Sequence, residues 1–143
     1  MQKDTFHEIA LLQELLDFSA VEDYVRSHSR GAHFFFSGTP RDMKDRQLVH
    51  SLFFEAYEPM ALSEMKHIRD RAMEVFQLEV AVIHHRLGDC ALREHAVLVG
   101  VGAPHRAAAF EACMWIMDEI KSKVPIWKKE TLANGSFWVT PHP

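Results

Sequence analysis

The sequence lacks the features that mark secreted, membrane and low-complexity proteins. Its 143 residues include only two cysteines, six glycines and six prolines. No apolar run approaches the ~18 residues that a membrane helix needs, and two cysteines cannot build a disulfide framework. Residues 1–8 contain no apolar core of the secretion-signal type and carry acids that a transit peptide avoids. We therefore expect a protein of the reducing cytoplasm.

An excess of positive charge is also missing. The formal net charge is −4, which excludes a nucleic-acid binder that relies on a broad basic field. Hydrophobic residues make up 48% of the chain and charged residues 25%, the balance of a globular domain that can bury its own core. We expect one domain over residues 1–143, with no nucleic-acid or membrane partner. Any anion site must then be a local basic cluster.

Hydrophobic periodicity predicts an α+β domain with antiparallel strands and about three helices. A capping box at residues 19–22 favours a short helix over 19–27, and longer helices are expected over 59–76 and 106–123. In the last helix, we expect Phe110, Cys113, Met114, Met117 and Ile120 to face inward. Strands are expected over 32–37, 48–55, 79–86, 96–101, 127–131 and 137–140, with loops at 38–42 and around Gly88-Asp89 and a hairpin turn at Asn134-Gly135. Residues 6–16 fit either a helix or a strand.

Two basic clusters are candidates for an anion site. His105-Arg106 opens the last helix, where free backbone N–H groups and the helix dipole favour an anion, although a solvated helix start has the same pattern. Lysines at positions 121, 123, 128 and 129 surround the apolar run 124–127. They are typical of a solvated helix end, but the tryptophan between them favours a pocket in which a lysine held against apolar surface acts as a proton donor or as a nucleophile. Met117, one turn before Lys121, would line the same pocket, and Arg41 is a further candidate from the 38–42 loop.

The histidines at positions 84, 85 and 95 and Cys90 are close in sequence, but their spacing matches no zinc-finger or catalytic zinc motif. Neighbouring strand residues also point to opposite faces, so His84 and His85 are not expected to bind one ion together. We expect no metal and no cofactor.

Five motifs follow one another along the chain. They are Gly38-Thr39-Pro40-Arg41, Glu55-Ala56-Tyr57, His85-Arg86-Leu87-Gly88, the run 103–113 (APHRAAAFEAC) and the run 121–130 (KSKVPIWKKE). Together they resemble the large, catalytic subunit of molybdopterin synthase over about residues 30–139, most specifically in the second half.

The resemblance implies an α+β domain of the hammerhead type, with a strand over residues 6–12. It also implies a homodimer in which each subunit binds a small ubiquitin-like sulfur carrier, giving a heterotetramer. The carrier's C-terminal Gly-Gly thiocarboxylate would enter a pocket, and two sulfurs would pass to cyclic pyranopterin monophosphate to form the dithiolene of molybdopterin. The substrate-contacting positions of the family fall on Thr39, Pro40, Arg41, His105, Arg106, Lys121, Lys128, Lys129 and Glu130.

Within that set, we expect Lys121 and Lys128 to carry the chemistry. Lys121 would hold the thiocarboxylate by charge, and Lys128 would give a proton to a departing oxygen. Arg41, His105 and Arg106 would stabilise negative charge that develops on phosphate oxygens. The chain departs from the family at Pro40, which has no backbone N–H to donate, and in the loop 42–47, which lacks the expected glycine.

One helix cannot bring both basic clusters to one small ligand. Arg106 and Lys121 would lie ~22 Å apart along it, so we expect a site shared between two subunits. The rival interpretation is a non-catalytic dimeric module that docks a ubiquitin-like tail. A phosphate-binding domain of another pathway is a weaker rival, because no glycine-rich phosphate loop is present.

Overall fold

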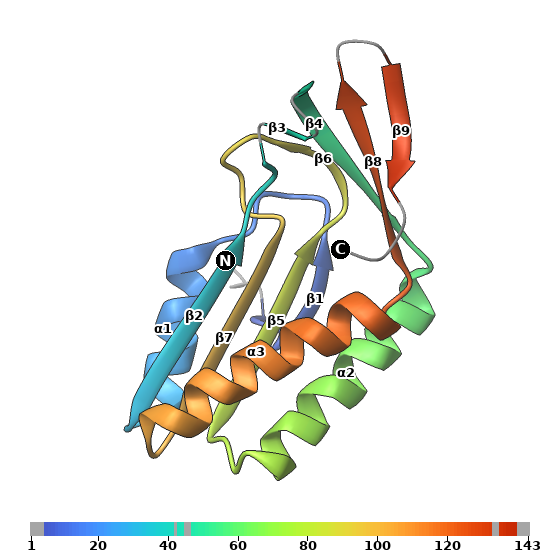
Figure 1. Cartoon of the computed structure of the whole chain (residues 1–143). Helices are drawn as coiled ribbons and strands as arrows, with labels where there is room; N and C mark the ends of the chain where they lie inside the picture. The colour runs from blue at the N-terminus through green and yellow to red at the C-terminus, as the bar shows by residue number, and fades with distance from the viewer. Residues whose placement is uncertain (1–4, 42, 45–46, 133–134, 140–143) are drawn as a thin grey trace.

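The computed structural model describes residues 5–41, 43–44, 47–132 and 135–139. This part of the chain folds into an α+β domain of two sheets and three helices (Figure 1). The elements in chain order are β1 (Ile9–Leu12), α1 (Phe18–His28), β2 (Ala32–Gly38), β3 (Met43–Lys44), β4 (Gln47–Ala56), α2 (Glu58–Val75), β5 (Val80–Arg86), β6 (Gly88–Ala91), β7 (Val97–Ala103), α3 (Arg106–Lys123), β8 (Ile126–Leu132) and β9 (Gly135–Val139).

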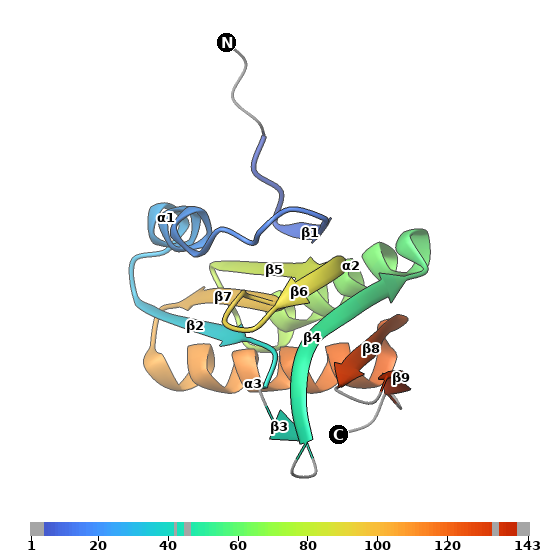
Figure 2. The ribbon, with the colours of Figure 1, turned by 90° about the horizontal axis from the view of Figure 1, so that it is seen from above.

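The first sheet has four strands in the order β1-β5-β7-β2 and is covered on both faces. Helix α1 packs on one face, whereas α2 and α3 pack on the other, as the view from above shows (Figure 2). The central strands β5 and β7 are almost wholly buried, which explains their continuous apolar runs. Neighbouring strands are antiparallel, as predicted, except at one edge, where β1 runs parallel to β5.

The second sheet has the order β3-β4-β8-β9, and β6 pairs with the other edge of β4. The pairing of β8 with β9 confirms the predicted hairpin, although Asn134 of its turn lies outside the described residues. Strand β6 falls where a loop was predicted around Gly88-Asp89. That prediction is wrong because a four-residue strand with one buried side chain, Cys90, gives little periodic signal.

The ambiguous N-terminal segment contains a strand, β1, at Ile9–Leu12. The next helix begins one residue earlier than predicted and has a different cap. Asp17 is its N-cap and accepts a hydrogen bond from the Ala20 N–H at 3.1 Å, so the capping box expected at residues 19–22 is wrong. Residues 42, 45 and 46 of the unusual 42–47 loop lie outside the described residues.

Helix α3 has the predicted bounds, but its inward face differs from the expected one. Cys113 and Ile120 are buried as predicted, together with Ile116 and two alanines. Phe110 and Met114 are 58% and 61% exposed, so their predicted inward orientation is wrong. Ala109 and Ala112 occupy the buried face instead, so the two larger side chains lie on an outer flank of the helix. Phe110 meets the ring of Phe34 there edge-on, with centroids 4.7 Å apart.

None of the helices in the described ranges combines the length and apolar character needed to cross a membrane.

Candidate active site

A pocket of about 290 Å³ lies where the first sheet, the second sheet and the end of α3 meet. Its wall is apolar over most of its area and includes Phe36, Leu52, Phe54 and Met117. Into this wall are set three cationic side chains that come from separate segments of the sequence: Arg41, Lys121 and Lys128. Because the chain has a net negative charge, an anion site was expected to be a local basic cluster, and these three side chains form one. The prediction that Met117 and Lys121 share a pocket is confirmed.

Lys121 and Lys128 are brought together by the short connection between α3 and β8. Lys121 lies in the last turn of α3, which ends at Lys123, and the Val124 N–H closes that turn on the Ile120 carbonyl at 3.1 Å. The Tyr57 N–H donates to the Pro125 carbonyl at 3.3 Å and ties this connection to the end of β4. The chain then enters β8, where Lys128 lies opposite Phe54 in the β4 ladder. Proline thus ends the helix and starts the strand that carries the second lysine.

Arg41 and its neighbours supply a further part of the pocket wall. Thr39 and Arg41 line the large pocket and also a second cavity of about 60 Å³ beside it. Pro40 and Glu130 line only the small cavity, which Lys128 borders as well. Glu130 is buried and lies two residues from Lys128 on the same face of β8. Six of the nine positions suggested by the family resemblance therefore lie together around these two cavities: Thr39, Pro40, Arg41, Lys121, Lys128 and Glu130.

Lys129 lies on the other face of β8. Its ammonium group lies 5.6 Å from the centroid of Phe53 and 5.2 Å from that of Trp138, on the outer side of the second sheet. Both distances are typical of cation–π contacts. Because successive strand residues alternate between faces, Lys128 and Lys129 cannot both enter the pocket. The structure therefore gives Lys129 a place in the outer sheet surface and not beside the other predicted residues.

His105 and Arg106 lie at the opposite end of α3 from the pocket. His105 is the N-cap residue, Arg106 begins the helix, and both side chains are exposed. Neither residue lines the large or the small cavity. Within one chain, the two basic clusters are thus separated by the length of α3, as the spacing predicted.

His85 is a pocket residue that sequence reasoning missed. It is the penultimate residue of β5 and lies on the α2–α3 side of the sheet. His84 faces the α1 side instead, with its Nε2 atom 2.7 Å from the His7 carbonyl oxygen. The ring of His85 is nearly fully buried and meets the ring of Phe54 edge-on, with centroids 4.9 Å apart. Strand alternation from the buried residue Ile83 would have placed His85 on the pocket side. Among the described residues, no three His, Cys, Asp or Glu side chains converge to hold a metal ion.

Comparison with known proteins decides the family. The model of the family described as "MoaE protein" matches residues 11–123 of this chain. The chain belongs to the MoaE family. The molybdopterin synthase catalytic subunit of Pyrococcus abyssi is 41% identical over 134 residues, which cover 92% of this chain and 90% of that relative. The corresponding subunit of Culex quinquefasciatus is also 41% identical, over 89% of this chain and 82% of its own length.

Solved structures agree with this assignment. Molybdopterin synthase from Staphylococcus aureus superposes with a TM-score of 0.87 at 31% identity, over 95% of this chain and 99% of that one. A Helicobacter pylori chain, solved as a complex of subunits 1 and 2 of molybdopterin-converting factor, shares the fold with a TM-score of 0.78 at 22% identity, over 94% and 91% of the two chains. The predicted family and fold class are confirmed. This MoaE chain is a catalytic subunit of molybdopterin synthase, a sulfurtransferase of molybdenum cofactor synthesis.

Proposed function

We propose that this MoaE chain transfers sulfur in the pocket that joins Arg41, Lys121 and Lys128. The donor is the C-terminal thiocarboxylate of a small ubiquitin-like carrier, and the acceptor is cyclic pyranopterin monophosphate. The Helicobacter pylori relative, which was solved with a second subunit, supports a partner of this kind. We place the reaction in the cytoplasm. The observation that carries the proposal is the convergence of three cations from separate segments on one mainly apolar cavity.

The cations suit both anionic ligands. A thiocarboxylate is a single negative charge at the end of a flexible tail, and Lys121 offers it a point charge at the pocket wall. Opening the cyclic phosphate moves negative charge onto phosphate oxygens, which the planar Arg41 guanidinium can bind with two parallel hydrogen bonds. Lys128, beside the buried Glu130, is the group proposed to protonate the departing oxygen. Such charges stabilise a transition state more strongly in a pocket that excludes water than in bulk solvent.

Each transfer changes the carrier and the pterin in a balanced way. A carbon–sulfur bond forms on the pterin where a carbon–oxygen bond breaks, and the displaced oxygen leaves as a phosphate oxygen or as water. The carrier is then joined to the pterin through a thioester. Water hydrolyses this thioester: the bond between sulfur and the acyl carbon breaks, the sulfur stays on the pterin, and the acyl carbon leaves as a carboxylate that contains the oxygen of the water. Two spent carriers are therefore released for each dithiolene that is made.

The remaining predicted residues, His105 and Arg106, reach a pocket only if two chains combine. Arg106 and Lys121 are separated by fifteen residues of α3, or about 22 Å at the helical rise. Two α3 helices that pack antiparallel about a two-fold axis would place Arg106 of one copy beside Lys121 of the other. The cations would then repel one another until an anionic ligand binds between them, which favours a phosphate-bearing substrate.

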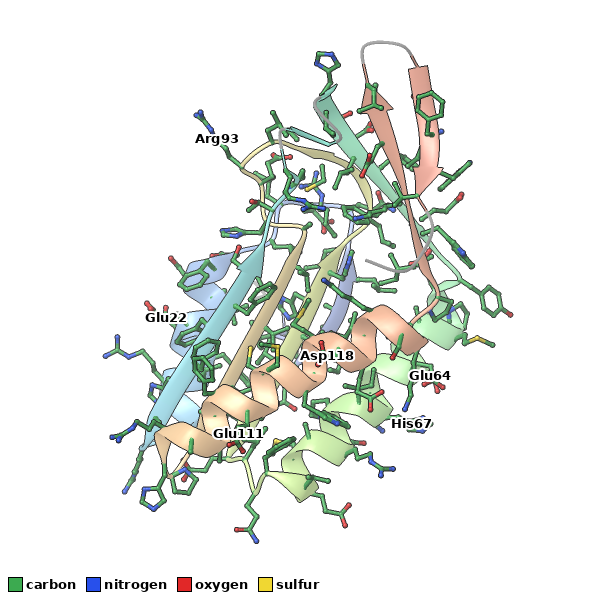
Figure 3. The ribbon with its side chains drawn as sticks, in the orientation of Figure 1. Glu22, Glu64, His67, Arg93, Glu111 and Asp118 are labelled. Atoms are coloured by element: carbon green, nitrogen blue, oxygen red, sulfur yellow. The ribbon has the colours of Figure 1, made fainter. Side chains whose placement is uncertain are left out.

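The outer flank of α3 supports this homodimer. Phe110, Met114 and Met117 follow one another at helical spacing between Arg106 and Lys121, and Met114 lies near the midpoint. The first two side chains are more than half exposed, and Met117 continues into the pocket wall. An apolar stripe of this kind on a helix surface is typical of an interface, and a two-fold axis makes it self-complementary. Glu111 and Asp118, also on α3, are exposed on the side turned away from the sheet (Figure 3). With one carrier on each chain, the assembly is a heterotetramer.

Reconstitution tests the proposal. The purified chain is mixed with the thiocarboxylated carrier and cyclic pyranopterin monophosphate, and the dithiolene product is measured after oxidation to its fluorescent derivative. We expect product with the thiocarboxylated carrier and none with the same carrier ending in a plain carboxylate. If the carrier binds tightly but no product forms, the chain is a non-catalytic docking module, and Pro40 is the first position to restore to the family's pattern.

A further inference from the structure

His85 is held rigidly in the wall of the pocket. Its Nδ1 atom lies 2.8 Å from the Arg86 carbonyl oxygen, and its ring meets Phe54 at an interplanar angle of 81°. The Arg86 N–H in turn donates to the Ala96 carbonyl at 2.8 Å, so the acceptor for Nδ1 belongs to an ordered part of the sheet. Two contacts at different edges of the ring therefore fix both its position and its orientation.

The contact with Arg86 sets the protonation of the ring. A carbonyl oxygen only accepts hydrogen bonds, so Nδ1 must carry the proton and donate it. In the neutral ring, Nε2 is then unprotonated and can only accept. Within the described residues, no group donates a hydrogen bond to Nε2. The atom is also not sealed inside the protein, because Arg86 Nη1 is the side-chain atom of the described residues that is enclosed without a partner. This nitrogen thus has one available function, which is to accept a hydrogen bond from a group inside the pocket.

The pocket also keeps His85 neutral. Burial lowers the pKa of His85 to about 4, in spite of the hydrogen bond to Arg86. At neutral pH, the pocket therefore contains a hydrogen-bond acceptor with no charge, set among the cations Arg41, Lys121 and Lys128. The cations bind the anionic parts of a ligand, whereas a neutral acceptor selects a part of the ligand that donates an N–H.

We propose that Nε2 of His85 accepts a hydrogen bond from an N–H group of the bound ligand and so sets the ligand's orientation next to Lys128. Phe54, which the imidazole contacts, is the cross-strand neighbour of Lys128, so His85 and Lys128 approach the ligand from adjoining parts of the wall. The inference rests on the proposed function, because the pocket must receive the sulfur donor and the pterin. The N–H belongs either to an amide of the carrier's Gly-Gly tail or to the pterin ring.

Variants at His85 and at its neighbour His84 test this role. His85→Phe keeps a ring against Phe54 and removes the acceptor, and His85→Gln supplies an amide oxygen that can accept in its place. His84→Gln is the matched control, since His84 is also buried, is adjacent in sequence, and faces away from the pocket with its Nε2 on the His7 carbonyl. We expect His85→Phe to lower kcat/KM about tenfold or more, His85→Gln to recover part of the loss, and His84→Gln to leave kcat/KM unchanged.

Two binding measurements identify which ligand donates. Affinity for the carrier that ends in a plain carboxylate, measured by calorimetry without pterin, falls in His85→Phe if a tail amide donates. The KM for cyclic pyranopterin monophosphate rises instead, with carrier affinity intact, if the pterin donates. Thermal unfolding of each variant separates these effects from a loss of folding, and a purely structural role would change stability without recovery of kcat/KM by glutamine.

Nitrogen-15 NMR of the imidazole gives an independent result on the wild-type chain. We expect the neutral tautomer with the proton on Nδ1, and a change in the Nε2 chemical shift when the donating ligand is added. A proton on Nε2, or an active enzyme in which His85→Phe leaves kcat, KM and carrier affinity unchanged, overturns the inference alone. A wild-type chain that makes no product refutes the proposed function and the role of His85 with it.

Discussion

The shared pocket predicts that two inactive variants restore each other's activity when they form mixed dimers. Arg106→Ala removes a cation at the start of α3, and Lys121→Ala removes one at its end, about 22 Å away. If each pocket takes Arg106 from one subunit and Lys121 from the other, a homodimer of either variant has two defective pockets. A mixed dimer has one pocket that lacks both cations and one pocket that is intact.

The size of the recovery follows from this arrangement. Random exchange between equal amounts of the two variants makes about half of the dimers mixed, and each mixed dimer has one intact pocket of two. The mixture should therefore reach about one quarter of wild-type activity. If each pocket were built from a single chain, every pocket in the mixture would lack one cation, and no recovery would occur.

Two different affinity tags on the variants allow the mixed dimer to be purified and subunit exchange to be verified. The fluorescent dithiolene derivative is then measured at saturating carrier. About half of wild-type activity is expected for the purified mixed dimer. Activity no higher than that of the separate variants, after exchange has been verified, would refute the shared pocket.

Three further predictions concern single positions. Lys129→Ala should reduce sulfur transfer far less than Lys128→Ala, because Lys129 packs on Phe53 outside the pocket; equal losses in kcat/KM would contradict this placement. Gly102→Ala should lower the free energy of unfolding by about 1–3 kcal/mol, because the new Cβ would lie 2.4 Å from both the Cβ and the Oγ of Ser29. Urea unfolding measures this loss. An unchanged urea midpoint would contradict the prediction and show that the sheet shifts at no cost to make room for the methyl group. Acid should destabilise the fold through His85, because burial lowers its pKa from 6.5 to about 4 in the folded chain. The contribution of neutral His85 to the free energy of unfolding is fully present above pH 6.5. It falls by about 3 kcal/mol at most as the pH drops towards 4. The His85→Phe variant should lose this part of the pH dependence in denaturant titrations, and an identical profile would refute the assignment.

The α3–β8 region was predictable because its signals are local. Pro125 between two lysine pairs ends a helix and begins a strand, so its neighbours Lys121 and Lys128 had to lie near each other. Strand alternation is enough to predict that Lys128 and Lys129 point to opposite faces of β8, whereas the family resemblance suggested that both contact the substrate. The ~22 Å between Arg106 and Lys121 followed from the helical rise as soon as the ends of the helix were known.

Features that depend on tertiary packing were not predictable in the same way. The apolar side chains of α3 cover more than one face, and only contact with the sheet shows that Phe110 and Met114 lie outside the core. Strand β6, which contains Cys90, pairs with β4, more than thirty residues earlier in the sequence. Hydrophobic periodicity is a local signal and does not predict which distant strand a segment pairs with. Strand alternation puts His85 on the α2–α3 side of the first sheet, but it does not show that a pocket opens there, because part of the pocket wall, Phe54, comes from the second sheet.

The most direct test of the central claim is the rate of sulfur transfer in three single-lysine variants. Lys121→Ala and Lys128→Ala remove cations from the pocket, and Lys123→Ala is the matched control, because Lys123 is exposed on the same helix and pairs with Glu119 at 2.8 Å. With saturating thiocarboxylated carrier, we predict that each of the first two variants loses about a hundredfold or more in kcat, while Lys123→Ala stays near the wild-type rate. Wild-type rates in Lys121→Ala and Lys128→Ala, with carrier binding intact, would contradict sulfur transfer in this pocket.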